Sequence, residues 1–185
     1  MRRAVGAALL ALGVMGLALA GGCAEPRYAS APYLADLDAR FADAAWDGVH
    51  LPEGQQCARF GGHGATPPLV VGNIPIEANA IILEFGDRNG DDPANGGWGV
   101  IGFRVPVGVR EAVIPALPGG VSALPEGFFL PRALGAAASV DKAYLPPCSG
   151  GQGHRYVVTI RAVAVPDKGG PIELLGMERL ALGTY

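Results

Sequence analysis

Glycine and proline constrain this chain more than any other feature of its sequence. Its 185 residues include 29 glycines and 16 prolines, residue types that interrupt helices and favour turns. Between clusters of Gly, Pro, Asn and Asp lie short apolar runs, at 68–71, 80–85, 98–105, 109–114 and 156–165. Runs of this length between turn residues are typical of strands. We therefore expect a mainly β protein, an antiparallel β-sandwich with few short helices.

The first 22 residues are a segment of a different kind. Arg2 and Arg3 precede an apolar stretch at 4–20, and small residues at 20–22 lead directly into Cys23. This pattern is typical of a bacterial lipoprotein signal peptide, removed before a cysteine that carries lipid. The stretch is shorter than the roughly 20 apolar residues that cross a bilayer. Ordinary cleavage without lipidation is the alternative, because alanine stands where leucine is commoner.

Removal of residues 1–22 leaves 163 residues, which are enough for one domain with a substantial core. We expect residues 23–40 to carry the lipid and act as a tether, and residues 41–185 to form the domain. Residues 33–41 fit either a helical turn or an entering strand. The mature chain has 12 basic and 17 acidic residues, a balance that argues against non-specific nucleic-acid binding.

The run Tyr-Leu-Pro-Pro-Cys-Ser-Gly-Gly-Gln-Gly-His-Arg-Tyr at 144–156 joins a Pro/Gly loop to a strand. Side chains alternate along a strand, so one face should hold His154, Tyr156, Val158, Ile160 and Ala162, and the other Arg155, Thr159 and Arg161. Both polar rings then point toward the apolar side. Together they can hold a phosphate-like anion, or they merely satisfy backbone carbonyls.

Other motifs accompany this run in a fixed order. Cys57 opens Cys-Ala-Arg-Phe-Gly-Gly-His-Gly-Ala-Thr-Pro-Pro-Leu, Asn73-Ile-Pro precedes the apolar stretch 78–85, and Leu-Gly-Thr-Tyr occupies 182–185. In this order the motifs resemble those of the phosphatidylethanolamine-binding protein family, in its bacterial Raf kinase inhibitor-like branch, over about residues 39–185. The resemblance implies the β-sandwich of that family.

The resemblance also implies a ligand pocket. It matches Asp87 to a pocket aspartate and Trp98 to a tryptophan, while Pro147, His154 and Tyr156 belong to the loop and strand motif. His154 and Tyr156 would donate hydrogen bonds to an anionic oxygen. Pro147 would shape the loop, and Asp87 would orient a ring or accept from a ligand ammonium group.

One pocket position departs from the family pattern. Gly97 stands where the family carries a histidine, so a charge-assisted hydrogen bond worth about 1.5–3 kcal/mol is absent. The space would be open to a different ligand, a water molecule or the opposite wall of the pocket.

Once Cys23 is assigned to lipid, Cys57 and Cys148 remain, in an exported protein where disulfides persist. We expect them to pair, because the matching family positions lie on loops beside the same pocket. A catalytic Cys148 with His154 is the rival interpretation, but no orienting carboxylate or oxyanion arrangement is visible in the sequence.

Metal binding has little support in the sequence. Asp87, Asn89 and Asp91 imitate the first ligands of an EF-hand loop, but the glycine and glutamate that such a loop needs later are missing. A hairpin turn explains these residues better. The histidines and cysteines lack zinc-ligand spacing. We expect neither a metal nor a cofactor.

These features together predict a non-enzymatic, lipid-anchored protein of the cell envelope that faces the periplasm or the cell exterior. Its ligand would be a small anion or a phospholipid headgroup, and it would inhibit or modulate a partner protein. The alternative is a structural or interaction lipoprotein of the envelope whose pocket no longer binds.

Overall fold

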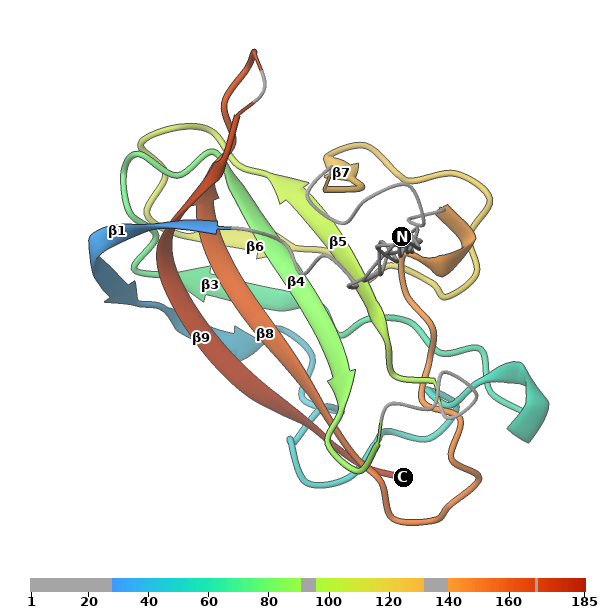
Figure 1. Cartoon of the computed structure of the whole chain (residues 1–185). Coiled ribbons are helices and arrows are strands. Elements are labelled where there is room, and N and C mark those ends of the chain that lie inside the picture. Colours follow the sequence, from blue (N-terminus) through green and yellow to red (C-terminus); the bar gives the residue numbers. More distant parts are fainter. Residues whose placement is uncertain (1–27, 91–95, 132–139, 169) are drawn as a thin grey trace, which may run out of the picture.

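The computed structural model describes residues 28–90, 96–131, 140–168 and 170–185 (Figure 1). Its larger sheet has six strands, in the spatial order β1 (Tyr28–Asp36), β9 (Ile172–Thr184), β8 (Arg155–Ala164), β4 (Ala80–Asp87), β5 (Gly99–Arg104) and β7 (Phe128–Phe129). The smaller has three, β2 (Asp38–Phe41), β3 (Leu69–Gly72) and β6 (Ala112–Ile114). Within the described ranges the helices are two single 3-10 turns, η1 (Ala58–Phe60) and η4 (Val140–Lys142).

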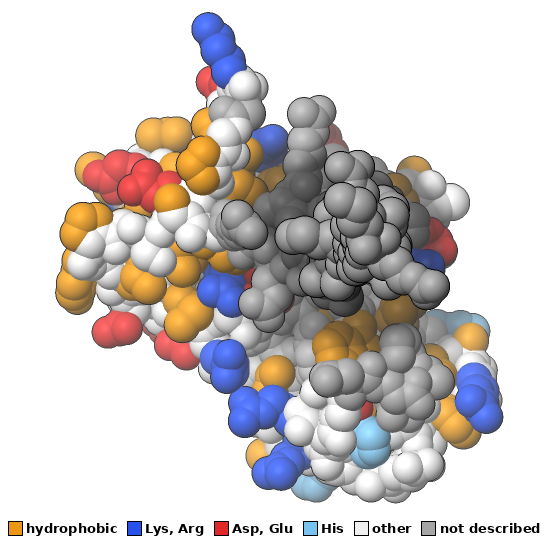
Figure 2. Space-filling view, viewed as in Figure 1, with side chains coloured by type: hydrophobic (Ala, Val, Ile, Leu, Met, Phe, Trp, Pro, Cys, Tyr) orange, Lys and Arg blue, Asp and Glu red, His pale blue; other side chains and the backbone are white. Residues whose placement is uncertain are grey.

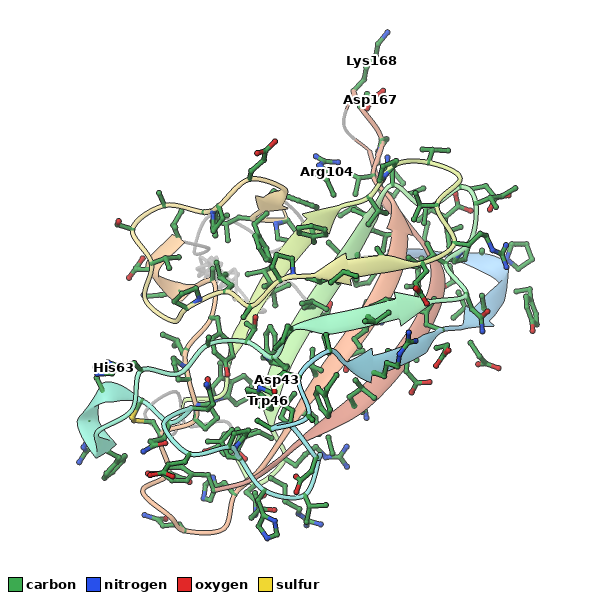
Figure 3. The ribbon with its side chains drawn as sticks, turned by 180° about the vertical axis from the view of Figure 1, so that it is seen from behind. Asp43, Trp46, His63, Arg104, Asp167 and Lys168 are labelled. Atoms are coloured by element: carbon green, nitrogen blue, oxygen red, sulfur yellow. A yellow bond between two sulfur atoms is a disulfide. The ribbon has the colours of Figure 1, made fainter. Side chains whose placement is uncertain are left out.

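The two sheets form a sandwich, so the predicted mainly β fold is confirmed. The small sheet lies behind β4, β8 and β9 in Figure 1 and in front of them in Figure 3. Neighbouring strands are antiparallel, except that β1 runs parallel to β9. The predicted alternation along β8 also holds, because Tyr156, Val158 and Ile160 are fully buried in the core between the sheets.

The predicted tether at 23–40 was wrong for residues 28–40, which belong to the sandwich. β1 pairs with β9, and β2 pairs with β3. The apolar residues of this stretch have helical spacing for another reason: the chain crosses from one sheet to the other. Leu34 packs on the outer face of the large sheet, whereas Leu37 is buried between the sheets and Phe41 stacks on Trp46.

The outer face of the large sheet, turned away from the small sheet, carries a polar cluster in its middle. The Arg161 guanidinium donates to Glu84 Oε2 from Nε at 2.8 Å, and the Tyr28 hydroxyl donates to Glu84 Oε1 at 2.7 Å. Arg161 also lies over the Tyr28 ring, 5.0 Å from its centroid. These contacts fix the start of β1 on the outer face. Among the described residues, no helix is long and apolar enough to cross a membrane.

The core contains a buried hydroxyl without a partner. The Tyr144 ring packs edge-on against Phe85, with 4.7 Å between centroids, and its Oη has no hydrogen-bond partner among the described residues. Burial raises the pKa of Tyr144 far above its ordinary value. A buried unsatisfied hydroxyl costs about 1–3 kcal/mol.

We predict that Tyr144→Phe raises the free energy of unfolding by about 1 kcal/mol at neutral pH, because it removes this hydroxyl and keeps the ring contact. The stability of the variant relative to the wild type should increase further above pH about 10. At that pH Tyr144 ionises in the unfolded wild-type chain but not in the folded one, which favours unfolding of the wild type. Urea unfolding at pH 7 and pH 10.5 measures both effects.

Tyr28→Phe is the matched control. It removes a hydroxyl that is bonded to Glu84, so it should lower stability at neutral pH. A loss of stability in Tyr144→Phe would contradict the prediction and indicate that the hydroxyl is satisfied, for instance by a buried water molecule.

Candidate functional site

The predicted site residues meet where β4 ends and β8 begins. Antiparallel pairing of these strands sets Asp87 opposite Tyr156, and the ladder continues as the Arg88 amide donates to the Arg155 carbonyl at 2.8 Å. His154 directly precedes β8. Its backbone exchanges two hydrogen bonds with Tyr185, of 2.9 and 3.0 Å. The main chain around the site is therefore fixed on both sides.

An ion pair between Asp87 and His154 lies at the centre of the site. His154 Nδ1 is 2.5 Å from Asp87 Oδ2, while Asp87 Oδ1 accepts from the Asn89 amide at 2.8 Å. The Asp87 side chain is fully buried, and the His154 side chain is 15% exposed. A buried carboxylate needs such partners to offset its lost hydration. Because Asp87 engages Nδ1, it directs the other ring nitrogen, Nε2, away from itself.

Trp98 and Pro147 lie on two loops that are hydrogen-bonded to each other. The Leu145 carbonyl accepts from the amides of Gly97 and Trp98 at 2.6 and 3.2 Å, and the Leu145 amide donates back to the Trp98 carbonyl at 2.7 Å. The indole Nε1 of Trp98 is buried and has no hydrogen-bond partner among the described residues. Such a donor is unusual in a folded protein and marks a place where a ligand or water can accept.

A disulfide holds the loop that carries Pro147, and the predicted pairing is confirmed. Cys57 and Cys148 are joined, with 5.2 Å between their Cα atoms and 91 positions between them in the sequence. The Cys57 amide donates to the Pro147 carbonyl at 2.8 Å. This covalent link occupies both thiols, so neither is a nucleophile in this state.

The opposite wall of the site fills the space beside Gly97. A Cβ atom on Gly97 would overlap the ring of Tyr156, which is fully buried. Gly97 also has a φ of 72°, in the left-handed region that favours glycine. The sequence left three possible occupants for this space: a different ligand, a water molecule or the opposite wall of the pocket. In the structure the opposite wall, formed by the Tyr156 ring, occupies it. The histidine of the family pattern does not fit here unless Tyr156 moves.

Tyr156 is also held at its hydroxyl. Burial raises its pKa, and the nearby Asp87 carboxylate acts in the same direction, whereas hydrogen bonds with the Ser149 side chain and with the Cys148 and Ser149 backbone oppose the shift. The hydroxyl therefore remains protonated at neutral pH. Its ring centroid is 6.4 Å from that of His154.

Two polar residues of the site were missed by the sequence analysis. Asn89 donates its amide to Asp87 and accepts from the Arg155 amide at 2.9 Å through its side chain. Ser149 is buried and donates to the Tyr185 carbonyl at 2.7 Å. The Asn-Gly pair at 89–90 signalled a turn, but its side-chain bond to β8 depends on the pairing of distant strands.

Two of the three residues that imitate an EF-hand loop lie in the described part of the chain. Asp87 faces His154, and Asn89 bonds to β8, so both are engaged within the site. Asp91 lies outside the described residues, as does Cys23. In the described part of the chain no group of three or more His, Cys, Asp or Glu side chains is placed to hold a metal ion.

We predict that Gly97→Ala lowers the free energy of unfolding by about 2–4 kcal/mol, from overlap with Tyr156 and the unfavourable left-handed backbone. Gly86→Ala is the control, because a Cβ at this strand position meets no atom within 4 Å. Thermal or urea unfolding compares the variants. Equal stability of the two would show that Tyr156 does not occupy the space.

Comparison with solved structures finds proteins of similar structure. A solved structure from Chlamydia trachomatis, described as a phosphatidylethanolamine-binding protein homologue, matches over 81% of this chain and 97% of that chain, with 21% sequence identity and a TM-score of 0.46. No family model and no curated protein matches the sequence. The fold described above rests on the order of the strands and the core between the two sheets.

Proposed function

We propose that this protein is a non-enzymatic, lipid-anchored envelope protein that binds a small anion or a phospho-headgroup at Asp87, Trp98, Pro147, His154 and Tyr156. The observation that carries the proposal is the ion pair of a fully buried Asp87 with a partly exposed His154. The pair fixes the imidazole while Nε2 stays directed away from the carboxylate. When protonated, Nε2 donates to an anionic oxygen.

The surrounding groups support the same ligand chemistry. In the proposed complex the indole N–H of Trp98, which is buried and has no partner among the described residues, would be a second donor to an anionic oxygen. The disulfide and the backbone bonds of Leu145 hold the two loops in place, which reduces the entropy lost on binding. Nothing in the proposal requires a nucleophile, a metal or a cofactor.

The family assignment belongs to the same proposal. The ordered motifs at 57–69, 73–85, 144–156 and 182–185 support membership of the phosphatidylethanolamine-binding protein family and its Raf kinase inhibitor-like branch. On this assignment the protein inhibits or modulates a partner protein.

One observation favours a second function. The Tyr156 ring occupies the space beside Gly97. This leaves less room for a ligand than the loss of the histidine side chain would otherwise give. An envelope interaction or structural lipoprotein, with this site as a rigid part of its fold, is therefore the alternative.

A phosphate titration distinguishes the two functions. We expect inorganic phosphate and phosphoethanolamine to shift the ring protons of His154 saturably, in NMR spectra of the mature chain with Cys23→Ser. His154→Ala should abolish binding and should also lower stability, because it removes a partner of the buried Asp87 carboxylate. His63→Ala is the control, because His63 is exposed and lies beside η1 on the loop labelled in Figure 3. No shift up to millimolar ligand would favour the structural role.

Lipid anchoring has its own test. We expect the full chain, produced in a bacterium, to fractionate with membranes and to yield an amino-terminal peptide whose mass includes lipid on Cys23. Cys23→Ser should move the protein to the soluble fraction. A membrane-bound Cys23→Ser variant, or a wild-type peptide without added lipid mass, would refute the anchor.

A further inference from the structure

The outer face of the large sheet carries four arginines, which we call the arginine face: Arg88, Arg155, Arg161 and Arg179. We propose that the arginine face docks on the anionic surface of a lipid bilayer. Figure 2 shows Lys and Arg side chains following one another across this side of the molecule, in the region of β8 and β9.

Strand geometry gathers these arginines. Arg155 and Arg161 share a face of β8 with Thr159, and Thr159 lies opposite Arg179 on β9. The Arg179 Nε donates to the Thr159 hydroxyl at 3.3 Å, so both side chains lie on the same face. Arg88 follows β4 and is bonded through its backbone to Arg155.

The arginine face has unbalanced positive charge. Glu84, on the same face of β4, is neutralised by Arg161 at 2.8 Å. Arg88, Arg155 and Arg179 are exposed, and among the described residues none of the three forms an ion pair with a carboxylate. Acidic residues exceed basic ones over the whole sequence, so this local excess is not a consequence of composition.

A hollow at one end of the face suits a headgroup. Its volume is about 290 Å³. Arg88, Arg155, Val157 and Ala181 line it together with Gly48, Gly183, Thr184 and Tyr156, the last of which also belongs to the candidate site. Guanidinium groups bind phosphate oxygens through paired hydrogen bonds, while the two apolar side chains can contact the glycerol region. This combination fits a phosphate at a lipid surface better than a wholly polar partner.

The short segment between Cys23 and β1 also favours a lipid bilayer as the partner of the arginine face. Tyr28 contacts Glu84 and Arg161 on the outer face, so β1 begins there. Tyr28 follows Cys23 by five positions, with four residues between them, a span of at most roughly 17 Å when fully extended. If Cys23 carries lipid, this tether keeps the outer face close to the bilayer. This step rests on the proposed anchor, whereas the charge and the hollow do not.

Vesicle co-sedimentation tests the proposal without the anchor. The protein is the mature chain from residue 23 with Cys23→Ser, mixed with phosphatidylglycerol–phosphatidylcholine vesicles or with phosphatidylcholine vesicles. We expect binding to the anionic vesicles only, and its loss at high salt. Arg155→Gln/Arg179→Gln should weaken binding by about 30-fold, because each basic residue near an anionic surface contributes about a fivefold effect.

Arg59→Gln/Arg110→Gln is the matched control, since it removes two exposed arginines on η1 and before β6, away from the arginine face. Equal weakening by both double variants, or no binding to anionic vesicles, would overturn the proposal. Binding to soluble polyglutamate but not to vesicles would overturn it in favour of an acidic protein partner.

The vesicle experiment tests the arginine face separately from the proposed lipid anchor and the proposed pocket. Vesicle binding uses a chain without lipid, so a refuted Cys23 modification leaves its result intact. His154→Ala keeps all four arginines and should bind vesicles as the unsubstituted chain does. Loss of vesicle binding in this variant would assign the lipid contact to the pocket and overturn the docking of the arginine face.

Discussion

The antiparallel pairing of β4 with β8 is the constraint on which the rest of the structure depends. Its register runs without a break from Ala80 opposite Val163 to Asp87 opposite Tyr156. Both strands lie inside the large sheet, so a slip by one residue would turn the buried apolar side chains toward solvent. The same register sets the ion pair of Asp87 with His154 at one end of the core and that of Glu84 with Arg161 on the outer face.

The candidate site combines a rigid frame with one buried donor, the Trp98 indole N–H, that has no partner among the described residues. The disulfide, the Leu145 backbone bonds and the contact of Tyr156 with Gly97 leave the loops little freedom. Rigidity of this kind serves binding when the remaining polar atoms face a ligand, and it serves stability when they do not. The exposed part of His154 favours the first case, whereas the packed Tyr156 ring favours the second.

The proposed site and the arginine face use side chains on opposite faces of β8. Tyr156 packs inward beside Asp87, while the side chains of Arg155 and Arg161 belong to the outer face. A protein held at a bilayer through this outer face would keep the two sides of the strand in different surroundings. Docking and ligand binding are therefore separable properties of one strand, since alternate residues point to opposite faces.

The sequence by itself determined the β class, most of the strands that lie between turn clusters, and the inward face of β8, because alternation and turn residues act over short distances. It did not reveal β9, whose alternation is broken by register shifts opposite 156–157 and 162–163. The stretch 28–40 also looked like a tether, since β1 gains its strand partner only from β9. The resemblance proposed five candidate site residues, whereas the hydrogen bonds that Asn89 and Ser149 make beside them were not predicted. Only the tertiary structure decided that Tyr156 would fill the space at Gly97, because that contact depends on how two distant loops close over β8.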